Sequence, residues 1–437
     1  MTRVAIVGTF DVENFGDLLF PIIAEHELRR RLGDVEVVPY SYHDRRAPDW
    51  PYDVKSLQRF PGDLLDFDLV LVGGGELIRF DKYIAPGYVP PSDEIHHPTG
   101  YWLVPTLLAV VHGVPVGWNA MGVTYEVPGW AVPIVEHATG SADYISVRDE
   151  RSADLVAAAS SAEIHVVPDT AFTLGSLLAP EPTPAFRALE LDRKYVVVQA
   201  SPALQSRADQ VHQALAAAAA EGLAVLELPI SPAIDDRTGL FECPRGLRRL
   251  ADWPSPMLMA EVIARAEAVI AFSYHLSIVA LVAGVPVHRL RDVGHAKIAA
   301  LERSPGVHFW AADDDGGERL LSALGRGAPG PDVAERVAQL ETHWDTIAAI
   351  AGRRHRPRPA LTADLAKRCL AAMEAPEPVN WLLRVERDQA RAELDLVLRS
   401  PAWRVTAPLR KTRQVGNAAI AAGRTLIRRH AFYRRLR

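Results

Sequence analysis

The chain has 437 residues, 49% of them hydrophobic and 23% charged, and this balance excludes a disordered protein. Its two cysteines, Cys243 and Cys369, exclude a disulfide framework and any CxxC motif for metal or redox chemistry. The formal net charge of −6 is unevenly spread, because residues 399–437 hold ten Arg and one Lys without Asp or Glu and so carry +11, against −17 elsewhere. A basic tail on an acidic body indicates an anionic partner, either a membrane surface or nucleic acid.

The first half of the chain alternates short apolar strands with helices. Strands are predicted at Val4–Val7, Val35–Tyr40, Leu69–Val72, Tyr144–Val147 and Ile164–Val167, and helices at Leu18–Leu32 and Glu150–Ala159. The apolar run at the N-terminus is too short for a secretory signal peptide, so we expect a cytoplasmic protein that begins with a strand. The alternation predicts a parallel sheet covered by helices on both faces.

The stretch from Tyr101 to Tyr125 contains no Asp, Glu, Lys or Arg and is long enough to span a bilayer. Pro105, Gly113 and Pro115 interrupt it. We therefore expect a buried helix, a tight turn and a buried strand in place of a membrane span.

A proline-rich joint, Ala179–Pro184, leads into a second series of the same kind. Its strands are predicted at Tyr195–Ala200, Ala224–Pro229, Ala268–Phe272 and Val285–Leu290, and its helices at Ala214–Ala220, at Met257–Glu267 and from Leu276 onward. The two series predict an α/β protein with two Rossmann-like domains facing across a cleft, at 1–180 and 190–330. In such sheets, ligands bind at the carboxyl ends of the strands.

The remainder of the chain is predicted to be helical and then strongly basic. An amphipathic helix is expected at Val333–Ile350 and a charged helix at Trp381–Leu398, within a helical extension at 331–398. In the tail at 399–437, apolar residues alternate with arginines, as in a helix that lies on a membrane surface. A solvated, disordered arm is the alternative, and nucleic-acid binding is not expected because no recognised nucleic-acid-binding module accompanies the charge.

The first candidate site residues follow the first strand. Asn14, Gly16 and Asp17 lie where a loop enters a helix, and unpaired backbone N–H groups at such a point can bind an anion. The spacing is not GxGxxG, so a dinucleotide-binding fingerprint is not supported. The alternative is that Asn14 and Asp17 only cap the helix and shape the turn.

Two further motifs end predicted strands. Gly73, Gly74 and Gly75 would let a ligand or another backbone segment approach closely, or they form only a tight turn. Arg148 can present its guanidinium to a phosphate or carboxylate, or it forms a surface pair with Asp149, which would cap the following helix.

The remaining candidates lie further along the chain. Asp169 follows a strand and is either a base or a turn-forming residue. His275 stands near a helix N-terminus, which favours the neutral imidazole, whereas an anion bound there would hold it protonated. A purely structural histidine is the alternative. Cationic residues follow at Arg289, Arg291 and Lys297.

The order and spacing of these motifs resemble the polysaccharide pyruvyl transferase family, from about Val4 to Leu301. The segments that carry the resemblance are NFGD (Asn14–Asp17), GGGEL (Gly73–Leu77), VPVGWNAMGV (Val114–Val123), SVRDERS (Ser146–Ser152), VPDTAF (Val167–Phe172), SYHLSIVALVAGVPV (Ser273–Val287) and Lys297. SVRDERS together with VPDTAF is the most specific portion.

The resemblance implies a fold similar to that of GT-B glycosyltransferases. It also implies transfer of the enolpyruvyl unit of phosphoenolpyruvate onto two hydroxyls of a sugar, which makes a cyclic pyruvate ketal and releases phosphate. Phosphoenolpyruvate is then the donor substrate, with no cofactor and no metal site assigned. On this resemblance Arg148 binds a donor anion, His275 binds the departing phosphate or acts as the acid, and Asp17 is a candidate base.

The same resemblance assigns supporting roles to the other motif residues. Asn14 would orient Asp17, with Gly16 in the same substrate-binding loop, and Lys297 would add positive charge. The run Gly73–Gly75 would keep the floor of the cleft open. Asp169 would order the edge of the cleft without reacting.

One position departs from the family pattern. The family commonly has an Arg two residues before the His, and Ser273 stands there in this chain. Losing a guanidinium that pairs with a donor anion removes on the order of 1.5–3 kcal/mol. Arg289, Arg291 or Lys297 are candidates to replace it. The departure leaves two alternatives open: a GT-B-type glycosyltransferase that uses a nucleotide-sugar, and a catalytically weak relative that acts as a scaffold.

The tail carries a second resemblance. Residues Ser400–Arg410 are similar to a short segment that often ends bacterial cell-surface glycosyltransferases. Together with the basic charge, this implies an enzyme held at the anionic inner face of the cell membrane, with a glycan or glycolipid acceptor used in envelope assembly.

Overall fold

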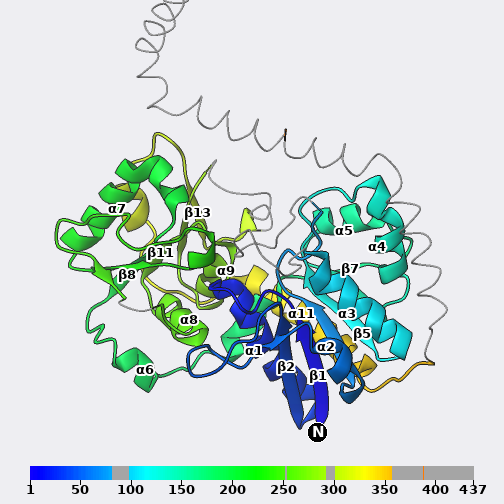
Figure 1. Ribbon diagram of the computed structural model, residues 1–437. Helices are drawn as coiled ribbons and strands as arrows, with labels where there is room; N and C mark the ends of the chain where they lie inside the picture. The colour runs from blue at the N-terminus through cyan, green and yellow to red at the C-terminus, as the bar shows by residue number, and fades with distance from the viewer. Residues whose placement is uncertain (81–97, 251–252, 292–300, 357–386, 388–437) are drawn as a thin grey trace, which may run out of the picture. The chain divides into compact units, whose positions relative to one another are not determined.

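The computed structural model describes residues 1–80, 98–250, 253–291, 301–356 and Arg387 (Figure 1). Lys297, the basic tail and, apart from Arg387, the predicted helix at 381–398 lie outside these residues. Within the described residues the named strands form two separate sheets, and in both of them neighbouring strands are parallel.

The first sheet has seven strands in the order β3-β2-β1-β4-β5-β6-β7. These strands are β1 (Thr2–Val7), β2 (Val35–Ser41), β3 (Lys55–Ser56), β4 (Leu69–Gly73), β5 (Val116–Met121), β6 (Tyr144–Val147) and β7 (His165–Val166). The helices of this part are α1 (Phe15–Leu32), α2 (Phe60–Asp63), η1 (Leu64–Asp66), α3 (Thr99–His112), η2 (Gly129–Ala131), α4 (Val132–Thr139), α5 (Glu150–Ala157) and η3 (Thr170–Ser176), where η denotes a 3-10 helix.

The second sheet has six strands in the order β10-β9-β8-β11-β12-β13. They are β8 (Tyr195–Gln199), β9 (Ala224–Leu228), β10 (Arg248–Arg249), β11 (Ala268–Ile270), β12 (Val287–Leu290) and β13 (Val307–Trp310). The helices here are α6 (Pro184–Arg187), η4 (Pro202–Arg207), α7 (Ala208–Ala220), η5 (Pro232–Ile234), α8 (Pro256–Ala264), α9 (Tyr274–Val282) and α10 (Gly316–Leu321).

Apolar composition explains why these segments form the interior strands. Every residue of β4 and of β8 is buried, as expected for strands that helices cover on both faces. The prediction of two parallel-sheet α/β domains is therefore confirmed.

The uncharged stretch folds as predicted. It forms the helix α3, a turn at Gly113 with φ of 70°, and the fully buried strand β5. The positive φ ends the helix at a residue without a Cβ, where the left-handed conformation costs little. Among the helices of the described residues, none is both long and apolar enough to cross a membrane.

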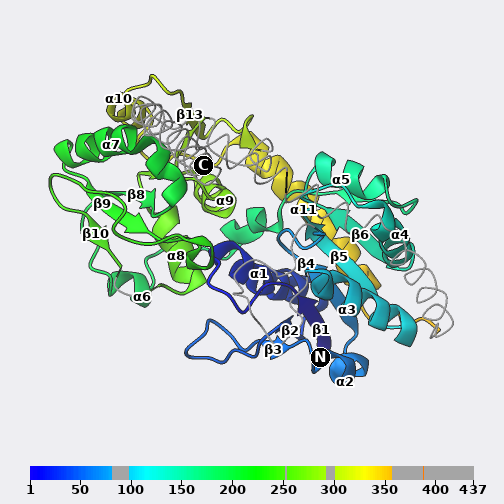
Figure 2. The same cartoon turned by 45° about the horizontal axis from the view of Figure 1, so that its top comes forward.

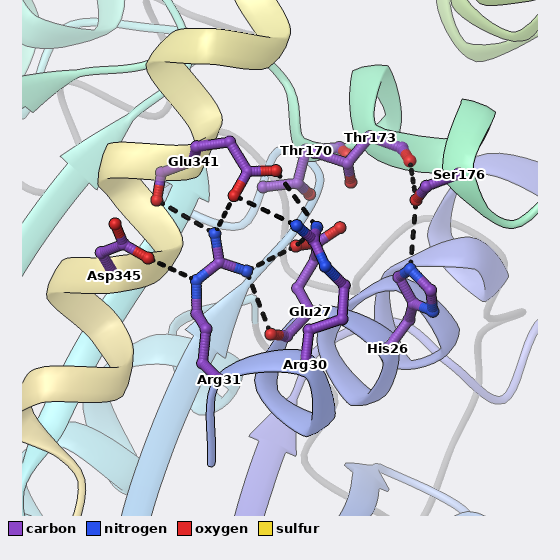
Figure 3. A network of polar contacts seen from close by, with 9 residues as sticks. All are labelled: His26, Glu27, Arg30, Arg31, Thr170, Thr173, Ser176, Glu341 and Asp345. Atoms are coloured by element: carbon purple, nitrogen blue, oxygen red, sulfur yellow. Dashed lines mark hydrogen bonds and ion pairs between the residues drawn. The ribbon is translucent and has the colours of Figure 1, made fainter. Parts of the chain in front are cut away.

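The helix α11 (Pro331–Ile350) follows the second sheet in sequence but packs against α1 and η3 (Figures 1 and 2). Its Trp344 is completely buried. Arg31 of α1 donates hydrogen bonds to Glu341 and Asp345 of α11 and to Glu27 of its own helix (Figure 3). The predicted helix at Val333–Ile350 is confirmed, and it packs against the N-terminal domain.

Both sheets reverse their strand order next to their first strand. In the first sheet, the chain runs from β1 outward to β3 and then returns to place β4 on the other side of β1. In the second sheet, β11 returns in the same way beside β8. The carboxyl ends of strands at such a reversal are the usual ligand site of open α/β sheets. The loops that follow β1, β4 and β11 carry NFGD, GGGE and SYH respectively.

Candidate active site

The loop after β1 contacts both α/β domains. Asn14 is the N-cap of α1, with φ of −130° and ψ of 106°, yet its side chain makes no capping bond. Its Nδ2 donates to Oδ2 of Asp17 at 3.0 Å, and its Oδ1 accepts a hydrogen bond from the Ser231 hydroxyl at 3.1 Å. The capping interpretation of the Asn14 side chain is therefore wrong. Asn14 links Asp17 to the second domain.

Asp17 is held from two sides. Besides Asn14, the Thr9 hydroxyl donates to its Oδ2 at 3.0 Å. A Cβ atom at Gly75 would lie 3.0 Å from its Oδ1, so the glycine run after β4 borders this carboxylate. The loops at the first switch point thus fix Asp17 in one position.

The glycines of this site allow close approach within the chain itself. Gly73, Gly74 and Gly75 have φ values of 134°, 90° and 80°, which other residues rarely adopt. A Cβ at Gly74 would lie 2.1 Å from the Phe20 ring of α1. A Cβ at Gly16 would lie 1.8 Å from Nδ1 of His275, so this glycine brings α1 against the second domain's histidine.

Arg148 is buried at the end of β6, with 6% of its surface exposed. Its guanidinium donates to Oε1 of Glu76 at 2.7 Å, and its Nε lies 3.5 Å from Asp149. Burial lowers the pKa of Arg148, but the carboxylates of Glu76, Asp169 and Asp149 outweigh burial and raise it. The surface-pair interpretation is therefore wrong, whereas Asp149 does cap α5 by accepting from the Ser152 N–H at 2.7 Å.

Asp169 and His275 form a buried pair. Oδ2 of Asp169 lies 3.3 Å from Nε2 of His275, while its Oδ1 accepts from the Ala171 N–H at 3.0 Å. Burial raises the pKa of Asp169, but His275 and Arg148 outweigh burial and lower it, so the carboxylate is ionised at neutral pH. Asp169 shapes the turn before η3 through the Ala171 N–H, and its other oxygen lies at ion-pair distance from the His275 ring.

Arg148 and His275 share their neighbours. Both lower the pKa of Asp169, and the Arg148 guanidinium lies 5.7 Å from the centre of the Tyr274 ring, next to His275 in sequence. The end of β6, the turn after β7 and the start of α9 therefore bring these residues to one place. The motifs did not predict that Tyr274 lies next to Arg148. They also did not predict that Glu76, in GGGEL, is the partner of Arg148.

Ser273 is the N-cap of α9. Its hydroxyl accepts from the Leu276 N–H at 3.3 Å, and its own N–H donates to Oε1 of Gln199 at 2.6 Å. Gln199, at the end of β8, also accepts from the Phe272 N–H at 2.9 Å. No motif predicted a role for Gln199, because a glutamine that ends an apolar strand does not form a recognisable pattern.

The predicted site residues thus divide into two groups. Those that the structure brings together, from the loops after β1, β4, β6 and β7 and from the start of α9, are Asn14, Gly16, Asp17, Gly73, Gly74, Gly75, Arg148, Asp169, Ser273 and His275. Lys297 lies outside the described residues. Within the described residues, no group of three or more His, Cys, Asp or Glu side chains is placed to hold a metal ion.

Two parallel-sheet domains with charged residues gathered at the carboxyl ends of their strands are typical of an α/β enzyme. The sequence model of the polysaccharide pyruvyl transferase family matches residues 14–291, and this range contains every candidate residue except Lys297. The chain belongs to that family and is a transferase. A search of curated protein sequences gave no match.

Several solved structures resemble this chain in fold. UDP-GlcNAc 2-epimerase from Methanocaldococcus jannaschii is 12% identical with a TM-score of 0.47, over 78% of this chain and 100% of that one. The Neisseria meningitidis UDP-GlcNAc 2-epimerase is 13% identical with a TM-score of 0.45, over 85% and 100%. WaaG, a glycosyltransferase involved in lipopolysaccharide biosynthesis, is 12% identical with a TM-score of 0.38, over 84% and 99%. At these scores we draw no functional conclusion from them.

Proposed function

We propose that this protein transfers the enolpyruvyl unit of phosphoenolpyruvate onto two hydroxyls of a sugar in a cell-envelope or extracellular glycan. The observation that supports this most is the meeting of Arg148, Asp169 and His275 at one place. The donor carries a phosphate and a carboxylate, so its binding requires fixed positive charge. Its methylene carbon must be protonated, and a sugar hydroxyl must lose a proton, so an acid and a base are needed.

The residues divide these tasks between them. Arg148 binds a donor anion. The Nε2 atom of His275 lies 3.3 Å from Asp169, and Nδ1 borders Gly16. His275 gives a proton to the methylene carbon or binds the departing phosphate, and Asp17, oriented by Asn14, accepts a proton from the attacking hydroxyl.

The atoms balance without a cofactor. Both sugar oxygens bond to the central carbon of phosphoenolpyruvate, and the bond from that carbon to the phosphate oxygen breaks. Of the two hydroxyl protons, one replaces the proton given to the new methyl group and the other leaves with inorganic phosphate. The products are the cyclic ketal and phosphate.

Two adjoining cavities at the carboxyl ends of β1 and β2 fit the acceptor sugar. Their volumes are about 590 and 640 Å³, within the usual range for small-ligand sites, and Asp44 and Arg45 line both. Trp50 and Glu13 line the first of them, and the loop that carries Glu13 continues directly into Asn14. An aromatic ring and carboxylates are groups suited to stacking on a sugar and bonding its hydroxyls.

The proposal is tested by phosphate release from phosphoenolpyruvate in the presence of candidate envelope glycans. We expect release by the wild-type protein and its loss in His275→Ala and Arg148→Ala. His112→Ala, which removes an exposed histidine at the end of α3, is the matched control and should retain full activity. Release at a near wild-type rate by His275→Ala or Arg148→Ala would remove those residues from the reaction.

A nucleotide-sugar transferase is the competing function. Thermal stabilisation by nucleotide-sugars, with none by phosphoenolpyruvate, would favour it and contradict the proposal. A catalytically weak scaffold would show no stabilisation by either ligand and no phosphate release.

We further propose that the basic tail at 399–437 holds the enzyme at the anionic inner face of the cell membrane, where lipid-linked acceptors would be modified. The support is its charge of +11 with interspersed apolar residues. Each basic residue close to an anionic leaflet contributes about 1 kcal/mol, so five engaged residues give firm but reversible binding.

A further inference from the structure

A buried arginine lies directly beneath the start of α9. Arg289 is the third residue of β12, pairs in register with Phe309 of β13, and has only 1% of its surface exposed. Charged side chains are almost never buried to this extent unless they are paired. The position therefore calls for an explanation in terms of what the charge does.

The guanidinium binds only neutral groups. Its amino groups donate to the carbonyl oxygens of Phe272 at 2.5 Å and Ser273 at 3.1 Å, and to the Ser277 hydroxyl at 2.7 Å. Its Nε has no partner among the described residues, and no described carboxylate lies within ion-pair distance of it. Burial lowers the pKa of Arg289 to about 10, so the group still carries its charge at neutral pH.

Among the described residues of the site, the Arg148 charge is already matched by Glu76 at 2.7 Å. His275 lies 3.3 Å from the ionised Asp169. Phosphoenolpyruvate brings two anionic groups, so it requires positive charge that these internal pairs do not cancel. The charge of Arg289, added to the partial positive charge of the α9 N-terminus, is available for that purpose.

We propose that Arg289 is a positioning residue that supplies, from beneath the Phe272–Ser273 backbone, the fixed positive charge for the donor's phosphate that position 273 itself lacks. This rests on the proposed function. Burying an unmatched charge is unfavourable in a folded protein, and an anion bound at the start of α9 would offset part of that penalty. The same hydrogen bonds hold the backbone that leads into His275.

The test compares Arg289→Met, which removes the charge at similar volume, with Arg289→Lys, which keeps it. The probe is inorganic phosphate, whose dissociation constant is measured by calorimetry without any turnover. We expect at least tenfold weaker phosphate binding for Arg289→Met and less than threefold weaker binding for Arg289→Lys. The KM for phosphoenolpyruvate should rise in parallel, while the KM for the acceptor stays unchanged.

A control variant separates the charge of Arg289 from folding. Arg265→Met removes an arginine whose Nε is bonded to Glu261 at 2.9 Å, and it should bind phosphate as the wild type does. Should Arg289→Met fail to fold, Arg289→Gln, which removes the charge but can still donate to the Phe272 or Ser273 carbonyl oxygen, replaces it with the same expected tenfold loss. Unchanged phosphate affinity in Arg289→Met, or a tenfold loss in Arg289→Lys, overturns the proposal. Phosphate binding that depends on Arg289 without turnover of phosphoenolpyruvate would refute the proposed reaction alone.

Discussion

The contact between Gly16 and His275 is the tightest at the site, and it joins the two α/β domains. Any side chain at position 16 would occupy the space of the imidazole, since a Cβ there falls 1.8 Å from Nδ1. A glycine in a helix interior usually weakens the helix, so its presence in the first turn of α1 has a steric reason.

Gly16→Ala should therefore displace His275 and lower the rate of phosphate release by about 100-fold, the typical effect of misplacing a reacting group by about 1 Å. The free energy of unfolding should change much less than the rate of phosphate release. Gly62→Ala in α2 is the matched control, because a Cβ there meets nothing within 4 Å. Equal activity of the Gly16 and Gly62 variants would show that His275 tolerates movement.

At this scale the sequence predicted the residues better than their partners. Arg148, Asp169 and His275 were predicted as candidates because strand-end motifs have recognisable chemistry. Their pairing was not, because Glu76 and Arg148 are 72 residues apart and only the tertiary fold brings them together. The buried Arg289 was noted only as a substitute, since sequence alone does not show that its charge is unmatched.

A buried histidine, His343, lies in the contact of helix α11 with the first sheet. Its Nε2 lies 2.8 Å from Oδ1 of Asn119, and its Nδ1 lies 3.0 Å from the Tyr144 hydroxyl, both within hydrogen-bond distance. Burial lowers the pKa of His343 from 6.5 to about 3.

The free energy of unfolding should therefore fall as the pH drops from 6.5 towards 3, by about 1.4 kcal/mol per pH unit from this group. The sign follows because the unfolded chain binds the proton in this range and the folded protein does not. In urea titrations at several pH values, the free energy of unfolding of His343→Gln should lack this part of the pH dependence. The same slope in both proteins would contradict the assignment.

The ion pairs between α1 and α11 give a second prediction, which concerns the stability of the protein. Glu27 is 1% exposed and binds Arg31 at 2.6 Å (Figure 3). Arg31→Ala should cost about 3–5 kcal/mol of stability, because it removes a main partner of a buried carboxylate. Arg29→Ala, which breaks an exposed pair with Glu25, should cost less than about 1 kcal/mol. Urea unfolding measures both, and equal losses would argue against a structural role for the buried pair.

Periodicity predicted the long elements and missed several of the short ones. The strands β1, β4 and β8 and the helix α11 were evident from apolar runs and amphipathic spacing. The short strands β3 and β10 and the strand β13 were not predicted, since edge strands of two to four residues carry little pattern. Helix α1 begins at Phe15, three residues before the predicted start, because Asn14 is its N-cap.

For the molecule as a whole, the tail is expected to decide where the enzyme works. Deletion of residues 400–437 should abolish co-sedimentation with anionic phosphatidylserine vesicles, because it removes nearly all of the tail's positive charge. Phosphate release from a water-soluble acceptor should persist. Vesicles without anionic lipid are the control, and binding that survives the deletion would refute the membrane role.

Helix α11 also constrains the order of events during synthesis. Asn119 and Tyr144 are made early, yet their partner His343 leaves the ribosome only after the whole second sheet. Until then, the nascent N-terminal domain exposes polar groups and apolar surface that the finished protein conceals. Its maturation therefore waits for translation to pass residue 350, and a polypeptide truncated before that point would be a substrate for chaperones and proteases.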